Sequence, residues 1–228
     1  NEFLKNKNYK DRSSTRQQRL KIKKYQNFID FECDAQNLKL LNNKLKKFKP
    51  HLIINCVGLV KQKINKNSNI KNTFYINSIF PHELYKISSK ISSRLIHFST
   101  DCVFDGLKGN YSENFVPNSI DLYGFSKKLG ELNYKNTLTL RTSIIGHELN
   151  NKFGLLEWFL SQKKTCEGFT KCFFSGFPTD EIYKILLKII KKKKLAGIYH
   201  LSSYKISKYE LLKKISKIYK FNIHIKKN

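Results

Sequence analysis

Short runs of neighbouring apolar residues alternate along the chain with longer segments whose apolar residues recur at helical spacing. The clearest runs span residues 51–55, 95–99 and 138–145. Runs of this kind are typical of strands that are buried on both faces of a parallel sheet. A segment of about twenty residues that includes Ile76, Ile79, Leu84 and Ile87 separates the first two runs and predicts a helix. The alternation predicts an α/β fold with a doubly wound parallel sheet.

The two ends of the chain extend this pattern. Before the first clear run, we expect a short helix and an irregular segment in 1–25, a strand in 28–34, and a helix in 35–48 that Pro50 closes. After Gly146 the expected elements are a helix at 155–160, a strand at 169–174, a helix at 179–191, a strand at 197–201 and a final helix opened by a capping box at Ser207 and Glu210. We therefore divide the chain into a sheet domain, 1–145, and a smaller lobe, 146–228, that is interleaved with it.

Composition narrows the class of protein. The 228 residues are 40% hydrophobic, which is enough for one sizeable core. No stretch approaches the roughly 18 apolar residues of a membrane span, and no segment has the form of a signal peptide. The five cysteines form no C-x-x-C pair. We expect a soluble cytoplasmic protein with reduced core thiols and no metal site; His51, His97 and His200 are expected to be satisfied core histidines.

The formal charge of +27 raises the question of a nucleic-acid partner. Only five of the 44 cationic residues are Arg, the preferred residue for bidentate phosphate and base contacts, and the lysines are spread along the whole chain. This distribution favours a solvated Lys-rich surface over a dedicated nucleic-acid interface. Anionic ligands, nucleotide-sugars included, are attracted in either case.

The candidate catalytic residues lie in two segments. Ser99-Thr100-Asp101 ends a predicted buried strand, and Tyr123 and Lys127 follow later in the chain. Ligands in open α/β sheets bind beyond the carboxyl ends of the strands, so Thr100 is placed at a substrate. Tyr123 and Lys127 are four residues apart and share one helix face. A nearby ammonium should lower the phenol pKa from about 10 and make a usable proton donor. A Thr100 hydroxyl aimed at the same carbonyl oxygen would polarise it.

A Y-x-x-x-K spacing alone has little weight in a chain with 12 Tyr and 44 basic residues. The strand-end Ser-Thr-Asp, about two dozen residues before the tyrosine, and the parallel-sheet pattern around both favour catalytic geometry over coincidence.

These segments resemble the dTDP-4-dehydrorhamnose reductase family of extended short-chain dehydrogenases/reductases. The resemblance rests on STDCVFDG at 99–106, GNYSE at 109–113, Pro117 and YGFSKKLGE at 123–131, and covers roughly residues 26–215. It implies a Rossmann-like sheet with a smaller C-terminal substrate-binding lobe. It also implies hydride transfer from NADPH or NADH to C4 of a nucleotide-activated 4-keto-6-deoxy sugar, in the synthesis of polysaccharide precursors.

The resemblance also implies roles for single residues. Thr100 would orient the carbonyl, Tyr123 would protonate it, and Lys127 would hold the nicotinamide ribose and tune Tyr123. The implied cofactor-binding residues are Asp34, Asn55, Cys56, Val57, Gly58, Ser99, Tyr123 and Lys127. The implied substrate-binding residues are Asn77, Asp101, Val103, Phe104, Arg141, Pro178 and Thr179.

The sequence departs from the family at its start. The family opens with a strand and a Gly-rich turn that binds the pyrophosphate, whereas the first glycine here is Gly58. We expect residues 1–9 to be the end of the first helix, with the phosphate loop lost upstream. Asp11 to Gln18 lacks the apolar run of a second strand, which leaves NADH and NADPH undecided.

Three functions stay open at this point. The first is the reductase. The second is a non-catalytic regulatory or partner-binding subunit, because the same resemblance includes a regulatory subunit of methionine adenosyltransferase. The third is nucleic-acid binding, which would weaken steeply with salt. The sequence also leaves a homodimer open.

Overall fold

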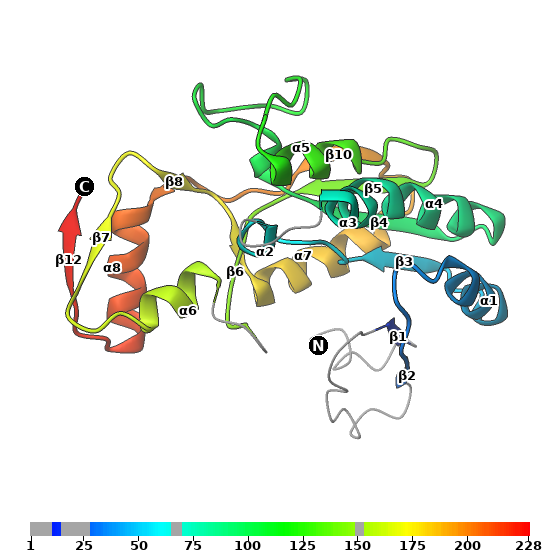
Figure 1. Cartoon of the computed structure of the whole chain (residues 1–228), viewed down its shortest axis with the longest axis horizontal. Helices are drawn as coiled ribbons and strands as arrows, with labels where there is room; N and C mark the ends of the chain where they lie inside the picture. The colour runs from blue at the N-terminus through cyan, green and yellow to red at the C-terminus, as the bar shows by residue number, and fades with distance from the viewer. Residues whose placement is uncertain (1–10, 15–27, 65–69, 149–152) are drawn as a thin grey trace.

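The computed structural model describes residues 11–14, 28–64, 70–148 and 153–228. Its centre is a four-stranded parallel sheet (Figure 1). The strands, in spatial order, are β10 (Gly197–His200), β5 (Thr137–Arg141), β4 (Arg94–Ser99) and β3 (Leu52–Asn55). Because all four run in the same direction, their carboxyl ends meet at one edge, and this edge carries the candidate site.

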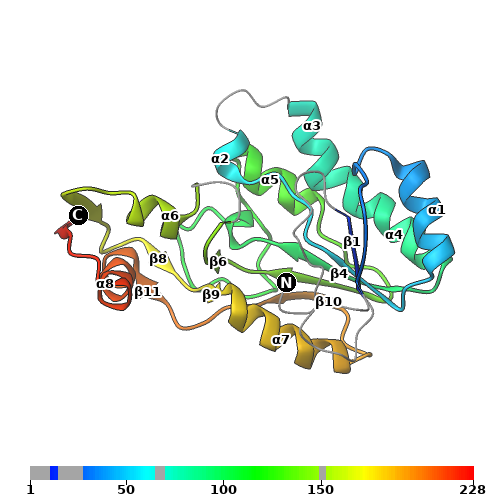
Figure 2. The ribbon, with the colours of Figure 1, turned by 90° about the horizontal axis from the view of Figure 1, so that it is seen from below.

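Helices cover both faces of this sheet, as Figure 2 shows. On one face lie α1 (Leu38–Phe48), α4 (Phe80–Lys90) and α5 (Leu122–Leu129), and on the other lies α7 (Thr179–Lys191). Side chains of β4 alternate between the faces: Leu95 joins a core with α1 and α4, whereas Ile96 joins a core with α7. The predicted doubly wound α/β fold is confirmed.

The helix predicted between β3 and β4 is interrupted by a turn of π-helix. α3 (Ile70–Phe74) continues through η2 (Tyr75–Ile79) into α4. Single π turns inside α-helices are frequent at functional sites. Here the turn carries Asn77, whose side chain reaches the loop that follows β3.

The N-terminal segment contains a strand that the hydrophobic pattern did not predict. β1 (Asp11–Ser14) pairs in parallel with β2 (Phe28–Phe31). The expectation of no strand from Asp11 is therefore wrong for residues 11–14, because ladder hydrogen bonds join backbone groups and require no apolar side chain. Other expectations for residues 1–10 and 15–27 lie outside the described residues.

The C-terminal lobe packs around a separate small core (left in Figure 1). Its elements are β6 (Ile144–Ile145), α6 (Leu155–Leu160), β7 (Thr165–Gly168), β8 (Phe173–Phe174), β9 (Phe177–Pro178), β11 (Ile206–Ser207), α8 (Lys208–Tyr219) and β12 (His224–Lys227). Ser207 caps α8 as predicted, with its Oγ accepting from the Glu210 amide at 3.1 Å. β10 is a strand of the main sheet and α7 packs on its face, although both follow residue 146, so the division at residue 145 stays a proposal.

Two predicted strands are broken in the structure. In the run 169–174, only Phe173–Phe174 (β8) form a strand, which pairs in antiparallel with β11, and residues 169–172 connect it to β7 without strand structure. The run 138–145 divides into β5 and β6, because β6 leaves the main sheet to pair with β9.

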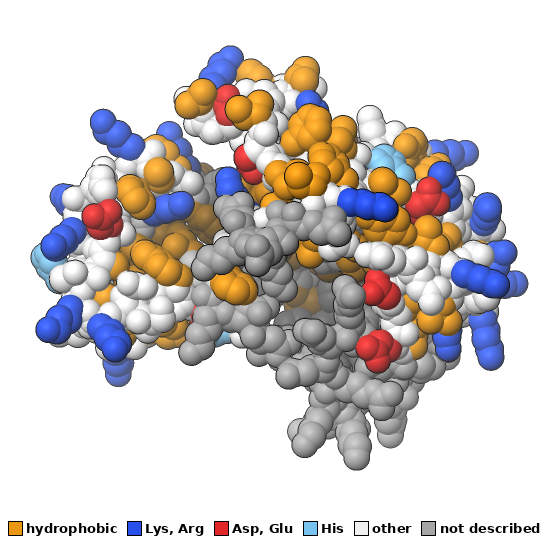
Figure 3. Space-filling view, viewed as in Figure 1, with side chains coloured by type: hydrophobic (Ala, Val, Ile, Leu, Met, Phe, Trp, Pro, Cys, Tyr) orange, Lys and Arg blue, Asp and Glu red, His pale blue; other side chains and the backbone are white. Residues whose placement is uncertain are grey.

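The cysteines and the charged surface were also predicted from the sequence. None of the five cysteines forms a disulfide. Cys33 and Cys166 are buried and Cys102 is intermediate, whereas Cys56 and Cys172 are exposed, so the expected core position is wrong for these last two. In the visible face of Figure 3, Lys and Arg side chains surround both the lobe and the sheet domain instead of forming one patch. Within the described ranges, no helix is long and apolar enough to cross a membrane.

Candidate active site

The end of β4 places Thr100 at the centre of a hydrogen-bonded turn. Thr100 caps the 3₁₀ turn η3 (Asp101–Val103) by accepting from the Cys102 amide at 3.2 Å. Its hydroxyl donates to Asp101 Oδ1 at 3.2 Å. Asp101 Oδ2 in turn accepts from Ser143 Oγ at 2.7 Å, so the β4 turn is tied to the segment after β5.

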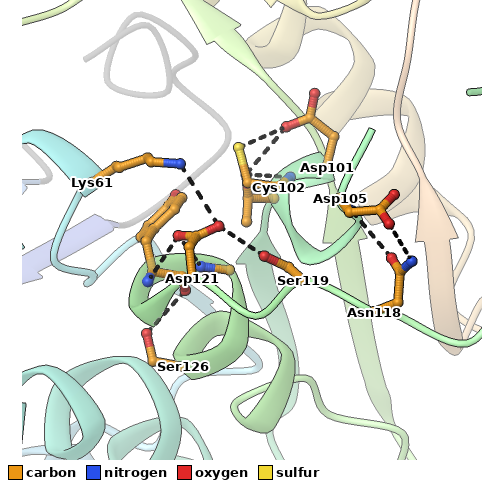
Figure 4. A network of polar contacts seen from close by, with 11 residues as sticks. Lys61, Asp101, Cys102, Asp105, Asn118, Ser119, Asp121 and Ser126 are labelled. Carbon is orange, nitrogen blue, oxygen red and sulfur yellow. Dashed lines mark hydrogen bonds and ion pairs between the residues drawn. The ribbon is translucent and has the colours of Figure 1, made fainter. Parts of the chain in front are cut away.

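Helix α5 begins beside this turn and carries Tyr123 and Lys127. Asp121 caps the helix by accepting from the amides of Tyr123 and Gly124 at 3.1 and 3.2 Å. Figure 4 shows the same carboxylate between Ser119 and Lys61, whose Nζ lies 3.7 Å from it. Asp121 was not singled out from the sequence, although an Asp before an apolar helix is an N-cap signal.

Gly124 allows α5 to approach η3 closely. A Cβ atom at this position would lie 2.1 Å from the Cys102 carbonyl oxygen, a separation that no side chain tolerates. The absence of a side chain therefore brings the first turn of α5 against η3, and with it Tyr123 against Thr100.

Tyr123 is held in its phenol form. Burial raises its pKa to about 12, the Thr100 hydroxyl beside it lowers the pKa in part, and the carboxylates of Asp101 and Asp121 raise it. The expected lowering of this pKa by Lys127 is wrong for this structure. Lys127 is not among the groups that shift the Tyr123 pKa, and its ammonium donates to the Phe98 carbonyl oxygen at 2.7 Å.

Lys127 is a buried cation under an exposed loop. Burial lowers its pKa to about 8, against the opposing effect of the Glu131 carboxylate. Gly58 lies above it, since a Cβ at Gly58 would be 3.8 Å from Nζ. A ligand lying on Gly58 would therefore be within reach of the ammonium.

The segment after β3 has a buried support and an exposed surface. Asn55 is buried, and its Oδ1 accepts from the Val57 amide at 3.1 Å. Cys56, Val57 and Gly58 are exposed. All four residues were predicted to bind the cofactor. Cys56, Val57 and Gly58 form a surface on which a ligand could lie, and Asn55 supports that surface through its hydrogen bond to Val57.

Asn77, a predicted substrate-binding residue, is hydrogen-bonded within the protein. Its side chain is fully buried; Oδ1 accepts from the Leu59 amide at 2.8 Å, and Nδ2 donates to the Leu59 carbonyl and Ser126 Oγ, both at 3.1 Å. In this structure the amide is thus used inside the protein. It ties the loop after β3 to α5.

Ser99 and Arg141 also point inward. Ser99 Oγ donates to Glu131 Oε1 at 2.8 Å, and Arg141 holds the same carboxylate through Nε and Nη2 at 2.8 and 2.7 Å. Arg141 Nη1 lies 3.2 Å from His200 Nε2. Ser99, predicted to contact the cofactor, and Arg141, predicted to contact the substrate, are thus both buried and bound to Glu131 in this structure. Glu131, four residues after Lys127, was missed.

The remaining predicted substrate residues divide between surface and core. Asp101, Pro178 and Thr179 are exposed, whereas Val103 and Phe104 are buried, with Phe104 stacked on the Tyr111 ring at 4.4 Å between centroids. Asp34 follows β2, partly exposed, and accepts from the Gln36 amide at 2.9 Å.

The histidines do not all lie in the core. His51 is exposed, so the expected core position is wrong there. Among the described residues, no group of three or more His, Cys, Asp or Glu side chains is arranged to hold a metal ion.

A comparison with known protein families places this chain in one of them. The family model described as RmlD substrate binding domain matches residues 4–225. This chain belongs to the RmlD family. The resemblance that the motifs indicated is therefore confirmed, and the Thr100, Tyr123 and Lys127 arrangement lies in an RmlD-family reductase fold.

Relatives of this RmlD-family chain include a dTDP-4-dehydrorhamnose reductase and the beta subunit of a methionine adenosyltransferase. The chain is 28% identical over 207 residues to methionine adenosyltransferase 2 subunit beta of Xenopus laevis, a match that covers 79% of this chain and 58% of that protein. It is 29% identical over 186 residues to dTDP-4-dehydrorhamnose reductase of Aggregatibacter actinomycetemcomitans, covering 75% and 62%. The chain thus spans about three fifths of the length of these curated relatives.

Solved structures agree on the fold. A hypothetical dTDP-4-dehydrorhamnose reductase from Sulfolobus tokodaii matches with a TM-score of 0.75 and 28% identity, covering 87% of this chain and 72% of that one. The Bacillus anthracis dTDP-4-dehydrorhamnose reductase in complex with NADP matches with a TM-score of 0.78 and 23% identity, covering 92% and 77%. The latter likeness shows the fold alone.

Proposed function

We propose that this RmlD-family chain reduces the C4 keto group of a nucleotide-activated 4-keto-6-deoxy sugar with NADPH or NADH, in the supply of polysaccharide precursors. The observation that carries the proposal is the assembly of the Thr100 hydroxyl, the Tyr123 phenol and the Lys127 ammonium at the carboxyl end of β4. A relative that is 29% identical over 186 residues is named as a dTDP-4-dehydrorhamnose reductase, which supports the substrate class.

The residues present fit a nicotinamide dinucleotide. The exposed surface of Cys56, Val57 and Gly58 offers backbone against which it could lie, and Gly58 leaves Lys127 Nζ uncovered by a side chain. Lys127 would hold a ribose hydroxyl there. The bound nicotinamide would supply a hydride to the sugar carbon.

The chain's own groups would handle the proton. Because the Tyr123 pKa is raised to about 12, the phenol carries its proton throughout the neutral range and can donate it to the keto oxygen as charge develops. The Thr100 hydroxyl, beside the phenol, would contact the same oxygen and hold the carbonyl in place. Asp101 and Ser143 orient Thr100 through their hydrogen bonds.

The function is tested by titrating the chain with NADPH and NADH through nicotinamide fluorescence and then adding dTDP-4-dehydrorhamnose. We expect binding of at least one dinucleotide and its oxidation only when the sugar is present. Binding of neither dinucleotide would refute the reductase proposal.

Dinucleotide affinity should depend on pH through Lys127. The native pKa of this group is lowered to about 8, so the ammonium that would hold the ribose is present below that pH and is lost above it. One pH unit beyond the pKa leaves about a tenth of the cation, so the affinity for NADPH should fall about tenfold between pH 7 and pH 9. Fluorescence titrations across this range measure the fall.

Lys127→Arg is the matched control for this dependence. A guanidinium does not titrate in this range, so the variant should bind NADPH with an affinity that stays constant from pH 7 to pH 9. An equally steep fall in Lys127→Arg would show that another group titrates.

A regulatory subunit is the second candidate, and the match to methionine adenosyltransferase 2 subunit beta favours it. Such a subunit would use the same fold to bind a partner enzyme. Gel filtration of this chain mixed with a methionine adenosyltransferase catalytic subunit tests the candidate. Co-elution without sugar-dependent dinucleotide oxidation would favour it over the reductase.

A further inference from the structure

His97 occupies the middle of the central strand of the site and has no solvent exposure. In the sheet register it lies opposite Asn55 of β3 and Thr139 of β5. Its Nδ1 is 3.0 Å from Asn55 Nδ2, and its Nε2 has no hydrogen-bond partner among the described residues. The expected satisfied core histidine is thus wrong for one of the two ring nitrogens.

The hydrogen bonds fix the protonation state of this ring. The Val57 amide can only donate, so the Asn55 oxygen faces Val57. The Asn55 amide nitrogen therefore faces His97 and donates to Nδ1, which must accept. His97 is then neutral with its proton on Nε2, because a proton on Nδ1 would oppose the Asn55 donor.

The surrounding charges agree with a neutral ring. Burial lowers the His97 pKa well below its usual value, and the nearby Lys127 and His82 lower it further. No acidic group is among the causes that act on this pKa. The ring therefore acts as a fixed hydrogen-bond acceptor at Nδ1 in the neutral range.

We infer that His97 is a positioning residue whose Nδ1 holds the Asn55 amide, and through it the Val57 backbone, so that the Cys56 to Gly58 surface is shaped for the dinucleotide. This inference rests on the proposed reductase function. The chain of contacts runs from β4 through β3 to the exposed loop: His97 Nδ1, Asn55 Nδ2, Asn55 Oδ1 and the Val57 amide.

Packing alone does not require a histidine here. A leucine would fill this fully buried position and would remove the Nε2–H of His97, which has no partner among the described residues, but it would leave the buried Asn55 Nδ2 without an acceptor. The feature that a leucine lacks is the acceptor for Asn55. The acceptor is therefore the property that the position uses.

Three variants distinguish the role of His97 as a hydrogen-bond acceptor from its role in filling the core. In His97→Asn, the side-chain Oδ1 occupies the place of Nδ1 and keeps an acceptor. His97→Gln places its amide nitrogen near the former Nε2 but has no heteroatom at the δ position, and His97→Leu has neither nitrogen. We expect His97→Asn to bind NADPH within about threefold of the wild type, and His97→Gln and His97→Leu to bind roughly tenfold more weakly.

Thermal stability should follow a different order. His97→Leu keeps the core filled, whereas His97→Asn removes ring volume and should have the lower Tm. A variant that is less stable but binds better is the result that a purely structural role does not produce. Losses of affinity that follow the losses of Tm across all three variants would overturn the inference.

Hydrogen exchange at the Val57 amide tests the same contacts without any cofactor. We expect its protection to be retained in His97→Asn and reduced at least tenfold in His97→Leu, with exchange in α7 unchanged. Unchanged protection of Val57 in His97→Leu would overturn the inference. If the wild type bound no dinucleotide, the reductase proposal would fail, while this exchange measurement would still decide whether His97 positions Val57.

Discussion

Replacement of Tyr123 by Phe is expected to lower the rate of sugar reduction by roughly two to four orders of magnitude while the fold is retained. The variant loses only the phenolic oxygen, which the structure places beside Thr100 and holds in the protonated form by burial. The ring remains to pack as before. Steady-state turnover of dTDP-4-dehydrorhamnose with NADPH measures the effect, and NADPH binding should change by less than about threefold because Lys127 is untouched.

Tyr85→Phe is the matched control for this change. Tyr85 lies on α4, where its ring stacks on Tyr134 with centroids 4.3 Å apart, outside the Thr100 and Tyr123 arrangement. Its replacement should leave turnover unchanged. Retention of more than about a third of the wild-type rate in Tyr123→Phe would exclude Tyr123 as the proton donor.

Arg141→Ala is expected to lower the free energy of unfolding by about 3–5 kcal/mol. Arg141 and Glu131 form a bidentate ion pair whose side chains are 4% and 6% exposed, and Ser99 donates to the same carboxylate. Removing the guanidinium leaves the Glu131 charge buried without its cation. Urea unfolding followed by circular dichroism gives the difference in free energy.

Two controls show whether the buried charge is the cause. The double variant Glu131→Gln/Arg141→Met removes both charges and should recover much of the lost stability, because burying uncharged side chains carries a smaller desolvation penalty. Lys86→Ala breaks an exposed pair with Glu83 and should change the unfolding free energy by less than about 1 kcal/mol. An Arg141→Ala effect as small as that of Lys86→Ala would contradict the buried-pair explanation.

Predictions from spacing succeeded where structure is decided by nearby residues. The helices at Leu155–Leu160 and Thr179–Lys191 have the predicted bounds, because helical periodicity and end signals lie within a few residues of each other. The Ser207 cap was found for the same reason. The candidate chemistry followed from two local rules: ligands bind at strand ends, and residues four apart share a helix face.

The direction in which a side chain points was not accessible in this way. Ser99 and Glu131 are 32 residues apart in the chain, and Asn77 and Ser126 are 49 apart, so no local pattern indicates that these groups satisfy each other inside the protein. Family motifs placed such residues near the site but did not distinguish a side chain that faces the ligand from one that supports the surface beneath it.

The sequence by itself determined the alternation of strands and helices, and with it the doubly wound sheet and the placing of Thr100, Tyr123 and Lys127 at one edge. Only the tertiary structure decided that Lys127 binds the Phe98 carbonyl, that burial keeps Tyr123 in the phenol form, and that His97 accepts from Asn55. The physical reason is that hydrophobic periodicity acts between neighbours, whereas pKa values and hydrogen-bond direction depend on desolvation and on partners distant in the chain.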